Sequence, residues 1–213
     1  IRFSGECTPQ EVDRLAAAAP GSPIVVGAGG GKCIDAGKAL ANRNDALMAS
    51  VPTIASTDAP TSHIYVMYDE NHRMLGVEKM RRNPALVLVD TAVIVRAPKK
   101  LFVSGIGDAI GKVYEVDGCA NAGGTTVFGA KSSWAAVTLG RACHGILLER
   151  AEGAFAAIDR GEPDEDFERV VEVVGQEHLF QFAVLEDMLF PAVLRTFLLG
   201  GVVQGFPVVG RNA

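Results

Sequence analysis

Apolar runs separated by small and polar residues dominate the first part of the chain. Residues 24–26 and 85–90 are continuous apolar runs, the pattern of strands covered on both faces in a parallel sheet, and residues 47–51 form a further strand candidate. Residues 62–69 place β-branched and aromatic side chains at alternate positions, and after a polar turn residues 73–78 are predicted to return as the second arm of a hairpin. The pattern predicts an α/β domain that combines a parallel sheet with a hairpin.

Helical periodicity precedes and follows these strands. Thr8 followed by Glu11 fits a capping box, which predicts a helix to about residue 18, and residues 34–40 are predicted to form a second helix. Later in the chain apolar residues recur at intervals of three and four, and helices are predicted at residues 102–116, 131–149, 167–174 and 179–199, the last broken at Pro191. We therefore predict an α/β domain over residues 1–98, followed by an all-helical domain over residues 99–213.

The first predicted strand runs directly into the loop GAGGGK at residues 27–32. Gly29, Gly30 and Gly31 leave no side chain between the backbone and a ligand, and the helix that follows presents N–H groups and the positive end of its dipole. Lys32 adds a full positive charge, so the loop is predicted to seat a nucleotide diphosphate. Neither the Rossmann fingerprint nor the P-loop motif fits completely, because Lys32 stands at the third glycine of the former and the first glycine of the latter is missing. A glycine-rich turn without a ligand is the alternative.

A second loop follows the strand at residues 47–51. Its sequence, VPTIASTDAPTS at residues 51–62, packs five hydroxyl residues and one carboxylate, Asp58, around two prolines. Hydroxyl groups bind phosphate and ribose oxygens, and a carboxylate close to a cofactor loop can accept hydrogen bonds from a polyol. A plain turn is again the alternative, since serine, threonine, aspartate and proline are common turn residues.

Together, GGGK and PTIASTDAPTS resemble the glycerol dehydrogenases of the iron-containing alcohol dehydrogenase superfamily. The motifs RNP at residues 82–84, LVLVDT at 86–91 and GIGDA at 105–109 extend the resemblance over about residues 4–150. It implies a Rossmann-like α/β domain followed by a helical domain, with ligands in the crevice between them. The activity it implies is NAD-dependent, metal-assisted oxidation of glycerol or a related vicinal diol to the hydroxy-ketone, which for glycerol is dihydroxyacetone.

The resemblance also assigns roles to individual residues. Asp108, in the GIGDA motif, would be one of three protein ligands of a catalytic zinc ion (iron is possible), beside two histidines, and Asp58 would hold another hydroxyl of the substrate. Without the resemblance, Asp108 fits a helix cap. Ser62, Ile64 and Tyr68 would hold the nicotinamide end of NAD. The complete set of implied NAD-binding residues is Gly29, Gly30, Gly31, Lys32, Thr53, Ser56, Ser62, Ile64 and Tyr68.

Two parts of the family pattern are missing from the sequence. The first β-α-β unit, with the acidic residue that binds the adenosine ribose, would precede residue 1, and the two histidine ligands would fall at or beyond residue 213. His144 and His178 lie in the helical half but lack the expected spacing, whereas His63 and His72 flank the hairpin and are expected to be solvated. We therefore expect an incomplete chain that by itself binds metal weakly and turns over poorly.

Composition narrows the class of protein. Of 213 residues 48% are hydrophobic and 21% charged, the balance of an ordinary globular protein, and the net charge of −5 argues against nucleic acid or an anionic membrane as partner. No apolar run reaches the roughly 18 residues of a membrane span. The four cysteines are scattered without C-x-x-C pairing, so reduced thiols in the cytoplasm are predicted. The family resemblance implies a homo-oligomer, a ring-like octamer.

Three other functions remain open at this point. A dehydroquinate synthase-like enzyme shares the fold and a related glycine loop but would need several lysines and arginines in its site. An sn-glycerol-1-phosphate dehydrogenase is closer, yet it too would show more basic residues near the substrate. A catalytically incomplete nucleotide-binding fragment is the third alternative.

Overall fold

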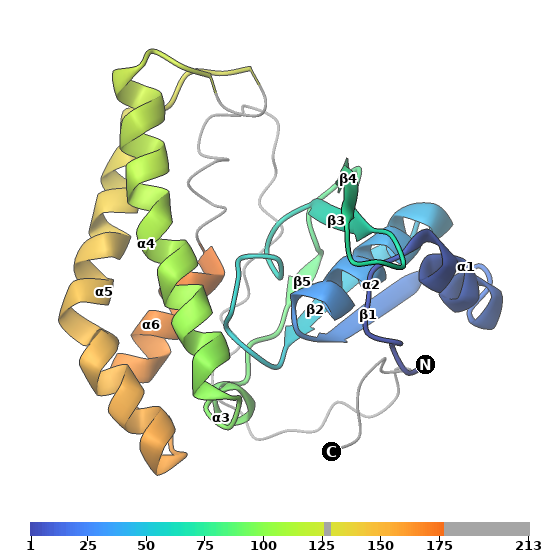
Figure 1. Ribbon diagram of the computed structural model, residues 1–213, viewed down its shortest axis with the longest axis horizontal. Helices are drawn as coiled ribbons and strands as arrows, with labels where there is room; N and C mark the ends of the chain where they lie inside the picture. Colours follow the sequence, from blue (N-terminus) through green and yellow to red (C-terminus); the bar gives the residue numbers. More distant parts are fainter. Residues whose placement is uncertain (126–128, 177–213) are drawn as a thin grey trace. The chain divides into compact units, whose positions relative to one another are not determined.

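The computed structural model describes residues 1–125 and 129–176 (Figure 1). Its described residues form two compact units, one built from residues 1–53 and 59–90 and the other from residues 54–58 and 91–176. The predicted boundary between residues 98 and 99 stays a prediction. The predicted helix at 179–199 and His178 lie outside the described residues.

The first unit is built on a three-stranded parallel sheet. Strands β1 (Ile24–Gly29), β2 (Leu47–Pro52) and β5 (Leu86–Val87) lie in the order β1-β2-β5, and Ile24 pairs with Leu47 at the start of the β1–β2 ladder. Helix α2 (Gly31–Asn44) connects β1 to β2 and packs along the sheet, and α1 (Pro9–Ala18) packs on α2 (Figure 1). The parallel sheet predicted from the apolar runs is therefore confirmed.

Local sequence signals explain how α1 begins. The Glu11 N–H donates to Thr8 Oγ1 at 3.1 Å, which is the predicted N-cap bond. The reciprocal half of the capping box is not formed: the Glu11 carboxylate accepts from the Ser4 N–H at 2.9 Å and from the Arg14 guanidinium. Glu11 therefore ties the segment before the helix to its first turn.

The last strand of the sheet differs from its prediction. β5 pairs with β2 only at Leu86 and Val87, although the N–H groups of Ala85 and Leu88 extend the hydrogen bonding to residues 85–88. Leu86 and Val89 are 39% and 43% exposed. The expectation of a continuous strand covered on both faces over residues 85–90 was wrong, because β5 is an edge strand of the described sheet.

The predicted hairpin is confirmed. Strand β3 (Ile64–Tyr68) pairs antiparallel with β4 (Met74–Lys79). In the turn between them, one carboxylate oxygen of Asp69 accepts hydrogen bonds from the N–H groups of Asn71 and Arg73, and His72 takes a positive φ of 61°. An aspartate at the start of the turn therefore shapes the reversal of the chain.

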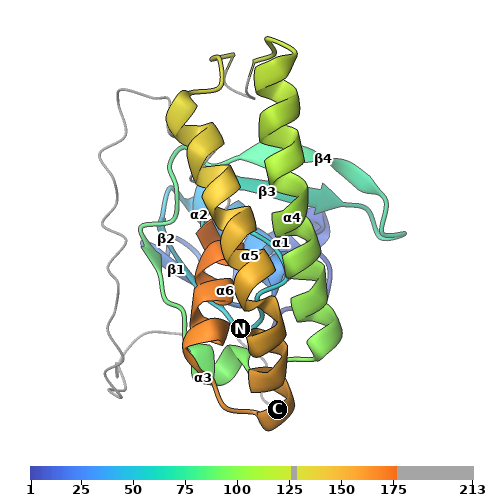
Figure 2. The same cartoon turned by 90° about the vertical axis from the view of Figure 1, so that its left-hand side faces the viewer.

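In its described residues, the second unit consists of helices, their connections and a loop at residues 54–58. Helices α3 (Thr91–Ile94), α4 (Lys99–Asn121), α5 (Trp134–Arg160) and α6 (Glu165–Gln176) pack together, with α4 beside α5 (Figures 1 and 2). The Phe102 ring stacks on Phe167 at 5.2 Å between centroids and meets Phe155 edge-on at 5.8 Å. The predicted helical character is confirmed for the described residues of this part, 99–125 and 129–176. Helix α5 runs past the predicted end at residue 149 to Gly161, whose φ of 73° closes it.

Candidate functional site

The glycine loop forms the predicted strand-to-helix junction in the first unit. β1 ends at Gly29 and α2 begins at Gly31, with Gly30 as an N-cap that offers no side-chain hydrogen bond to the helix. The N–H groups of Cys33 and Ile34 both donate to the Gly30 carbonyl, so the helix is formed from its first turn. The beginning of α2 is therefore open to an anionic ligand.

Two glycines keep this junction compact. A Cβ at Gly29 would lie 2.8 Å from the Cβ of Cys33, so any side chain there would displace the first turn of α2. A Cβ at Gly37 would lie 3.3 Å from the Cα of Gly27, which shows how closely α2 approaches β1. Gly37 thus supplies the close helix-to-strand packing for which the Rossmann fingerprint uses its third glycine. Nothing in the sequence around Gly37 predicted this role.

Lys32 lies at the junction but is engaged by a carboxylate. Its Nζ is 2.5 Å from Glu6 Oε2 and 5.2 Å from the centre of the Tyr68 ring. His72 Nδ1 lies 2.6 Å from the same carboxylate oxygen. Burial by itself raises the pKa of Glu6, but hydrogen bonds from Lys32, His72 and the Cys7 N–H outweigh it and lower the pKa below its usual value. A diphosphate bound here would compete with Glu6 for Lys32.

The two hairpin histidines differ from each other. The His72 side chain is 73% exposed, as predicted, but it contacts Glu6. His63 is only 9% exposed, so the expectation of a solvated side chain was wrong. The Met80 N–H donates to the His63 carbonyl, so the hairpin ladder extends to His63, directly before β3. Burial, and then the charges of Lys79 and Lys38, lower the pKa of His63.

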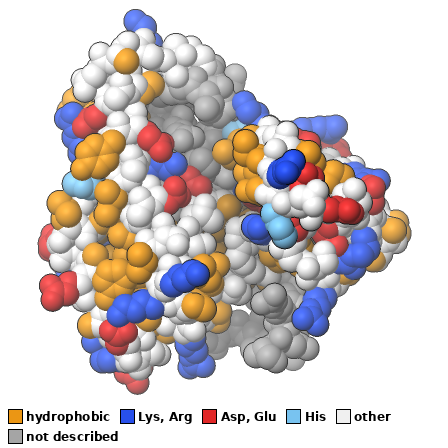
Figure 3. Space-filling model, in the orientation of Figure 1, with side chains coloured by type: hydrophobic (Ala, Val, Ile, Leu, Met, Phe, Trp, Pro, Cys, Tyr) orange, Lys and Arg blue, Asp and Glu red, His pale blue; other side chains and the backbone are white. Residues whose placement is uncertain are grey.

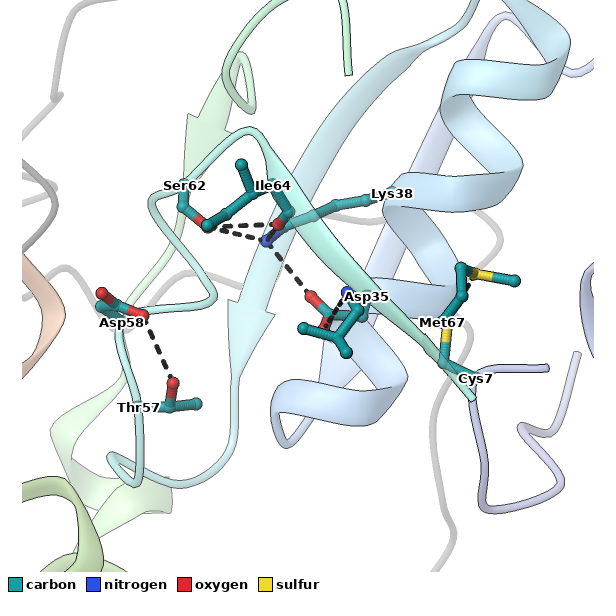
Figure 4. A network of polar contacts seen from close by, with 9 residues as sticks. Cys7, Asp35, Lys38, Thr57, Asp58, Ser62, Ile64 and Met67 are labelled. Carbon is teal, nitrogen blue, oxygen red and sulfur yellow. Dashed lines mark hydrogen bonds and ion pairs between the residues drawn. The ribbon is translucent and has the colours of Figure 1, made fainter. Parts of the chain in front are cut away.

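Four of the predicted cofactor-binding residues, Thr53, Ser62, Ile64 and Tyr68, have clear local partners in the first unit. The Thr53 N–H donates to the Gly29 carbonyl at 3.0 Å and so extends the β1–β2 junction. Ser62 Oγ and the Ile64 carbonyl both contact Lys38 Nζ, at 3.1 Å and 2.7 Å (Figure 4). Tyr68 lies under Lys32. The structure therefore brings Ser62 and Ile64 onto a buried lysine to which the sequence analysis gave no role.

Asp58 and Asp108 both belong to the second unit. Asp58 is 8% exposed, and one of its carboxylate oxygens accepts from Thr57 Oγ1 at 3.3 Å. Asp108 lies in the interior of α4, ten residues into a helix that begins directly after Pro98, so the alternative of a helix cap is wrong. Ser56 lies in the same loop as Asp58 and is partly exposed.

The two carboxylates influence each other. Burial raises the pKa of Asp108, and the negative charges of Asp58 and Glu115 raise it further, although Lys112 acts in the opposite direction. Lys112 Nζ lies 4.0 Å from Asp108 Oδ1 and 3.5 Å from Glu115 Oε2. A half-buried carboxylate with a raised pKa beside a second buried carboxylate is typical of a functional site.

Gly105 allows the loop of Asp58 to approach helix α4. A Cβ at this position would lie 2.3 Å from the Ala55 carbonyl oxygen and 2.9 Å from Val174 Cγ1. Only a residue without a side chain leaves room for the loop. Gly105 therefore allows the loop to hold Asp58 close to Asp108. In the sequence, Gly105 was noted only as the first residue of the GIGDA motif.

The described residues do not assemble a metal site around Asp108. Within residues 1–125 and 129–176, no group of three histidine, cysteine, aspartate or glutamate side chains is positioned to hold a metal ion. The His144 ring packs edge-on against Tyr114, 6.2 Å between centroids, and Asp108 Oδ1 lies 4.0 Å from the ammonium group of Lys112. The donor set present here does not fit a three-ligand zinc centre.

Comparisons with known proteins identify relatives of the chain. A model of the iron-containing alcohol dehydrogenases matches residues 2–91. Glycerol dehydrogenase of Pseudomonas putida is 40% identical over 174 residues, 81% of this chain and 48% of that enzyme. Its Escherichia coli counterpart is 39% identical over 172 residues, 80% of this chain and 47% of that enzyme. The crystal structure of a probable glycerol dehydrogenase from Sinorhizobium meliloti superposes with a TM-score of 0.77 at 34% identity, covering 83% of this chain and 52% of that one.

The comparisons confirm the predicted resemblance, and the alignments of 172 to 174 residues are longer than the stretch of about residues 4–150 that was predicted. The chain spans about half the length of the curated relatives it matches. The matched part includes the glycine loop and both aspartates of the second unit, since the alignments cover about four fifths of the chain and the family model covers the first unit. Residues 2–91 therefore match the iron-containing alcohol dehydrogenases, and the chain is a homologue of the glycerol dehydrogenases.

Proposed function

We propose that the chain forms the cofactor-binding and substrate-binding part of an NAD-dependent dehydrogenase that oxidises glycerol or a related vicinal diol to the hydroxy-ketone. The observation that carries the proposal is the pair Asp58 and Asp108, two carboxylates in one unit whose charges interact. Two acceptors at such a site suit the adjacent hydroxyl groups of a neutral polyol. The 40% identity to a glycerol dehydrogenase supports the same substrate class.

We propose separate roles for cofactor-binding and substrate-binding residues. In the first unit, Gly29, Gly30, Gly31, Lys32 and Thr53 bind the diphosphate of NAD, while Ser62, Ile64 and Tyr68 hold its nicotinamide end. Ser56 is a further proposed NAD-binding residue. Asp58 and Asp108 accept hydrogen bonds from the substrate hydroxyls and so orient the carbon that loses hydride. Bound NAD would supply the hydride acceptor.

A metal ion, zinc or iron, belongs to the proposal through the family name alone. Around Asp108, the described residues do not form a group of three side chains that could hold a metal ion. We therefore assign no step of the reaction to the metal in this chain, and weak metal binding by the chain alone stays our prediction.

Phosphorylated substrates are less compatible with the second unit. The cation beside Asp108 is Lys112, which also lies 3.5 Å from Glu115, so its charge is already shared between two carboxylates. A phosphate group would face negative charge from Asp58 and Asp108. This disfavours an sn-glycerol-1-phosphate dehydrogenase and a dehydroquinate synthase-like enzyme.

Assembly and location are further parts of the proposal. Large apolar side chains are exposed on the second unit, where Tyr114, Leu148 and Trp134 are 68%, 72% and 82% exposed, and Figure 3 shows apolar surface there. Apolar surface of this kind supports a homo-oligomer. All four cysteines are free thiols, which supports a location in the cytoplasm. None of the described helices is long and apolar enough to cross a membrane.

Substitution of Asp58 by asparagine tests the proposed substrate class. With NAD and glycerol, the rate of NADH formation by the Asp58→Asn variant is expected to fall at least about 10-fold. The amide oxygen carries no negative charge and therefore accepts a weaker hydrogen bond from the substrate hydroxyl than the carboxylate does. Propan-1-ol lacks the second hydroxyl and is expected to react slowly with both proteins. Equal rates of glycerol oxidation in the two proteins would contradict the assignment of Asp58, and a preference of the wild-type chain for propan-1-ol would contradict the diol as substrate.

A further inference from the structure

The outer edge of strand β3 is closed by side chains and a loop. β4 pairs with one edge of β3. On the other edge, Lys38 Nζ donates to the Ile64 carbonyl at 2.7 Å (Figure 4). The Val66 N–H donates to Asp35 Oδ2 at 3.1 Å, and the Tyr68 N–H donates to the Cys7 carbonyl at 2.9 Å. Every second residue of β3 is held in this way. Helix α2 therefore takes the place of a neighbouring strand.

Lys38 is the centre of this arrangement. Its side chain is fully buried, and its Nζ lies 3.3 Å from Asp35 Oδ1 and 3.1 Å from Ser62 Oγ. Lys38 and Asp35 are three residues apart on α2, so both side chains leave the same face of the helix. Their contacts on β3 and its preceding loop lie 24 to 31 residues further along the chain.

A buried ion pair is an unusual way to hold a strand to a helix. Removing an ammonium group from water is costly, and well-packed apolar residues often stabilise a fold as well or better. An apolar pair would, however, leave the Ile64 carbonyl and the Val66 N–H without these partners. What the ion pair provides is a fixed position for the backbone at Ile64 and for the hydroxyl of Ser62.

We infer that Lys38, together with Asp35, is a positioning residue that fixes Ser62 and Ile64 for binding of the nicotinamide end of the cofactor. The inference rests on the proposed function, which gives Ser62 and Ile64 that role. Lys38 itself is buried behind them and acts through them. Both the lysine and its contacts lie in the first unit.

The Lys38→Met variant tests this positioning role in the 213-residue chain. NADH affinity, followed by the fluorescence of the reduced nicotinamide, is expected to fall about 10-fold or more, since small displacements of binding groups have large effects. Hydrogen exchange of the Val66 amide is expected to become faster in the same variant. As a control for general destabilisation, Val12→Ala removes buried apolar volume from α1 in the same unit and is expected to leave NADH affinity within about twofold.

A double variant separates positioning from stability. Lys38→Met combined with Asp35→Leu removes both charges and is expected to regain thermal stability relative to Lys38→Met alone. NADH affinity is expected to stay low, because the Ile64 carbonyl and Ser62 hydroxyl still lack the ammonium. Recovery of affinity together with stability would overturn the inference.

The wild-type titration distinguishes the two levels of the proposal. A wild-type chain that binds no NADH would overturn the proposed function. A wild-type chain that binds NADH, with a Lys38→Met variant that binds it equally well, would overturn the role of Lys38 and leave the proposed function standing.

Discussion

Substitution of Gly105 by alanine is expected to lower the free energy of unfolding of the second unit by about 3 kcal/mol, the upper part of the range for overpacking a core. The new methyl group would lie 2.3 Å from the Ala55 carbonyl oxygen and 2.9 Å from Val174 Cγ1. The backbone of the loop would have to move, because a carbonyl cannot rotate away as a flexible side chain can. Asp58 lies three residues after Ala55, so the substrate site is expected to be displaced as well.

Gly111→Ala is the matched control for this experiment. It lies in the same helix α4, and a Cβ there would meet nothing within 4 Å. Alanine is the better helix former, so this variant is expected to be as stable as wild type or more stable by up to about 1 kcal/mol. Urea unfolding followed by circular dichroism measures both. Equal stabilities for Gly105→Ala and Gly111→Ala would contradict the close approach of the loop to α4.

The second large effect is expected at Asp108. The Asp108→Asn variant keeps the shape of the side chain but loses its charge, and kcat/KM for glycerol is expected to fall at least about 100-fold, the loss of about 2.7 kcal/mol of transition-state stabilisation. The matched control is Glu115→Gln on the same helix, which removes another carboxylate close to Lys112. It is expected to change kcat/KM by less than about threefold. Similar losses in both variants would contradict a specific role for Asp108.

Stability is expected to move in the opposite direction to activity. Burial, together with the charge of Asp58, raises the pKa of Asp108 in the folded chain above its value in the unfolded chain. A group of this kind favours the folded state while it is protonated, and this contribution is lost as the pH rises through the folded pKa. At neutral pH Asp108→Asn is therefore expected to melt at a higher temperature than wild type, and at acid pH the difference is expected to vanish. A variant less stable than wild type at neutral pH would contradict the raised pKa.

Much of the fold follows from local sequence signals. Thr8 caps α1 as predicted, the apolar run at residues 24–26 becomes the first half of β1, and the alternation after Ser62 becomes β3. Each of these signals lies within a few residues of the structure it determines. The length of α5 was underestimated because nothing before Gly161 ends the helix.

The interactions that organise the candidate site depend on residues far apart in the chain. Lys38 looked like an ordinary helix residue, because its partners Ser62 and Ile64 lie beyond the next strand and loop. Gly105 looked like part of a motif, and its contact with Ala55 spans 50 positions. No local pattern predicts which carbonyl a helix will meet. Asp58 was noted from its place in the second loop, whereas the role of Asp108, and a substrate shared by the two carboxylates, came only from the family resemblance.

The contacts of Glu6 could not be predicted from the sequence either. Charge patterns near the N-terminus gave no sign that it would hold both Lys32 and His72, since these lie 26 and 66 residues away. The structure thereby gives Lys32 a competitor for the phosphate that the sequence analysis assigned to it. The competition makes the diphosphate seat testable in both directions.

Titration of NADH into the chain, with the Lys32→Met and Glu6→Gln variants beside it, addresses the diphosphate seat directly. Saturable binding is expected for wild type. Lys32→Met is expected to weaken it about 10-fold, or about 1.4 kcal/mol, because the cation at the start of α2 is lost. Glu6→Gln is expected to strengthen it, because Lys32 is released from the carboxylate. Absence of saturable binding to wild type, or equal affinities in all three proteins, would contradict a cofactor site at the glycine loop.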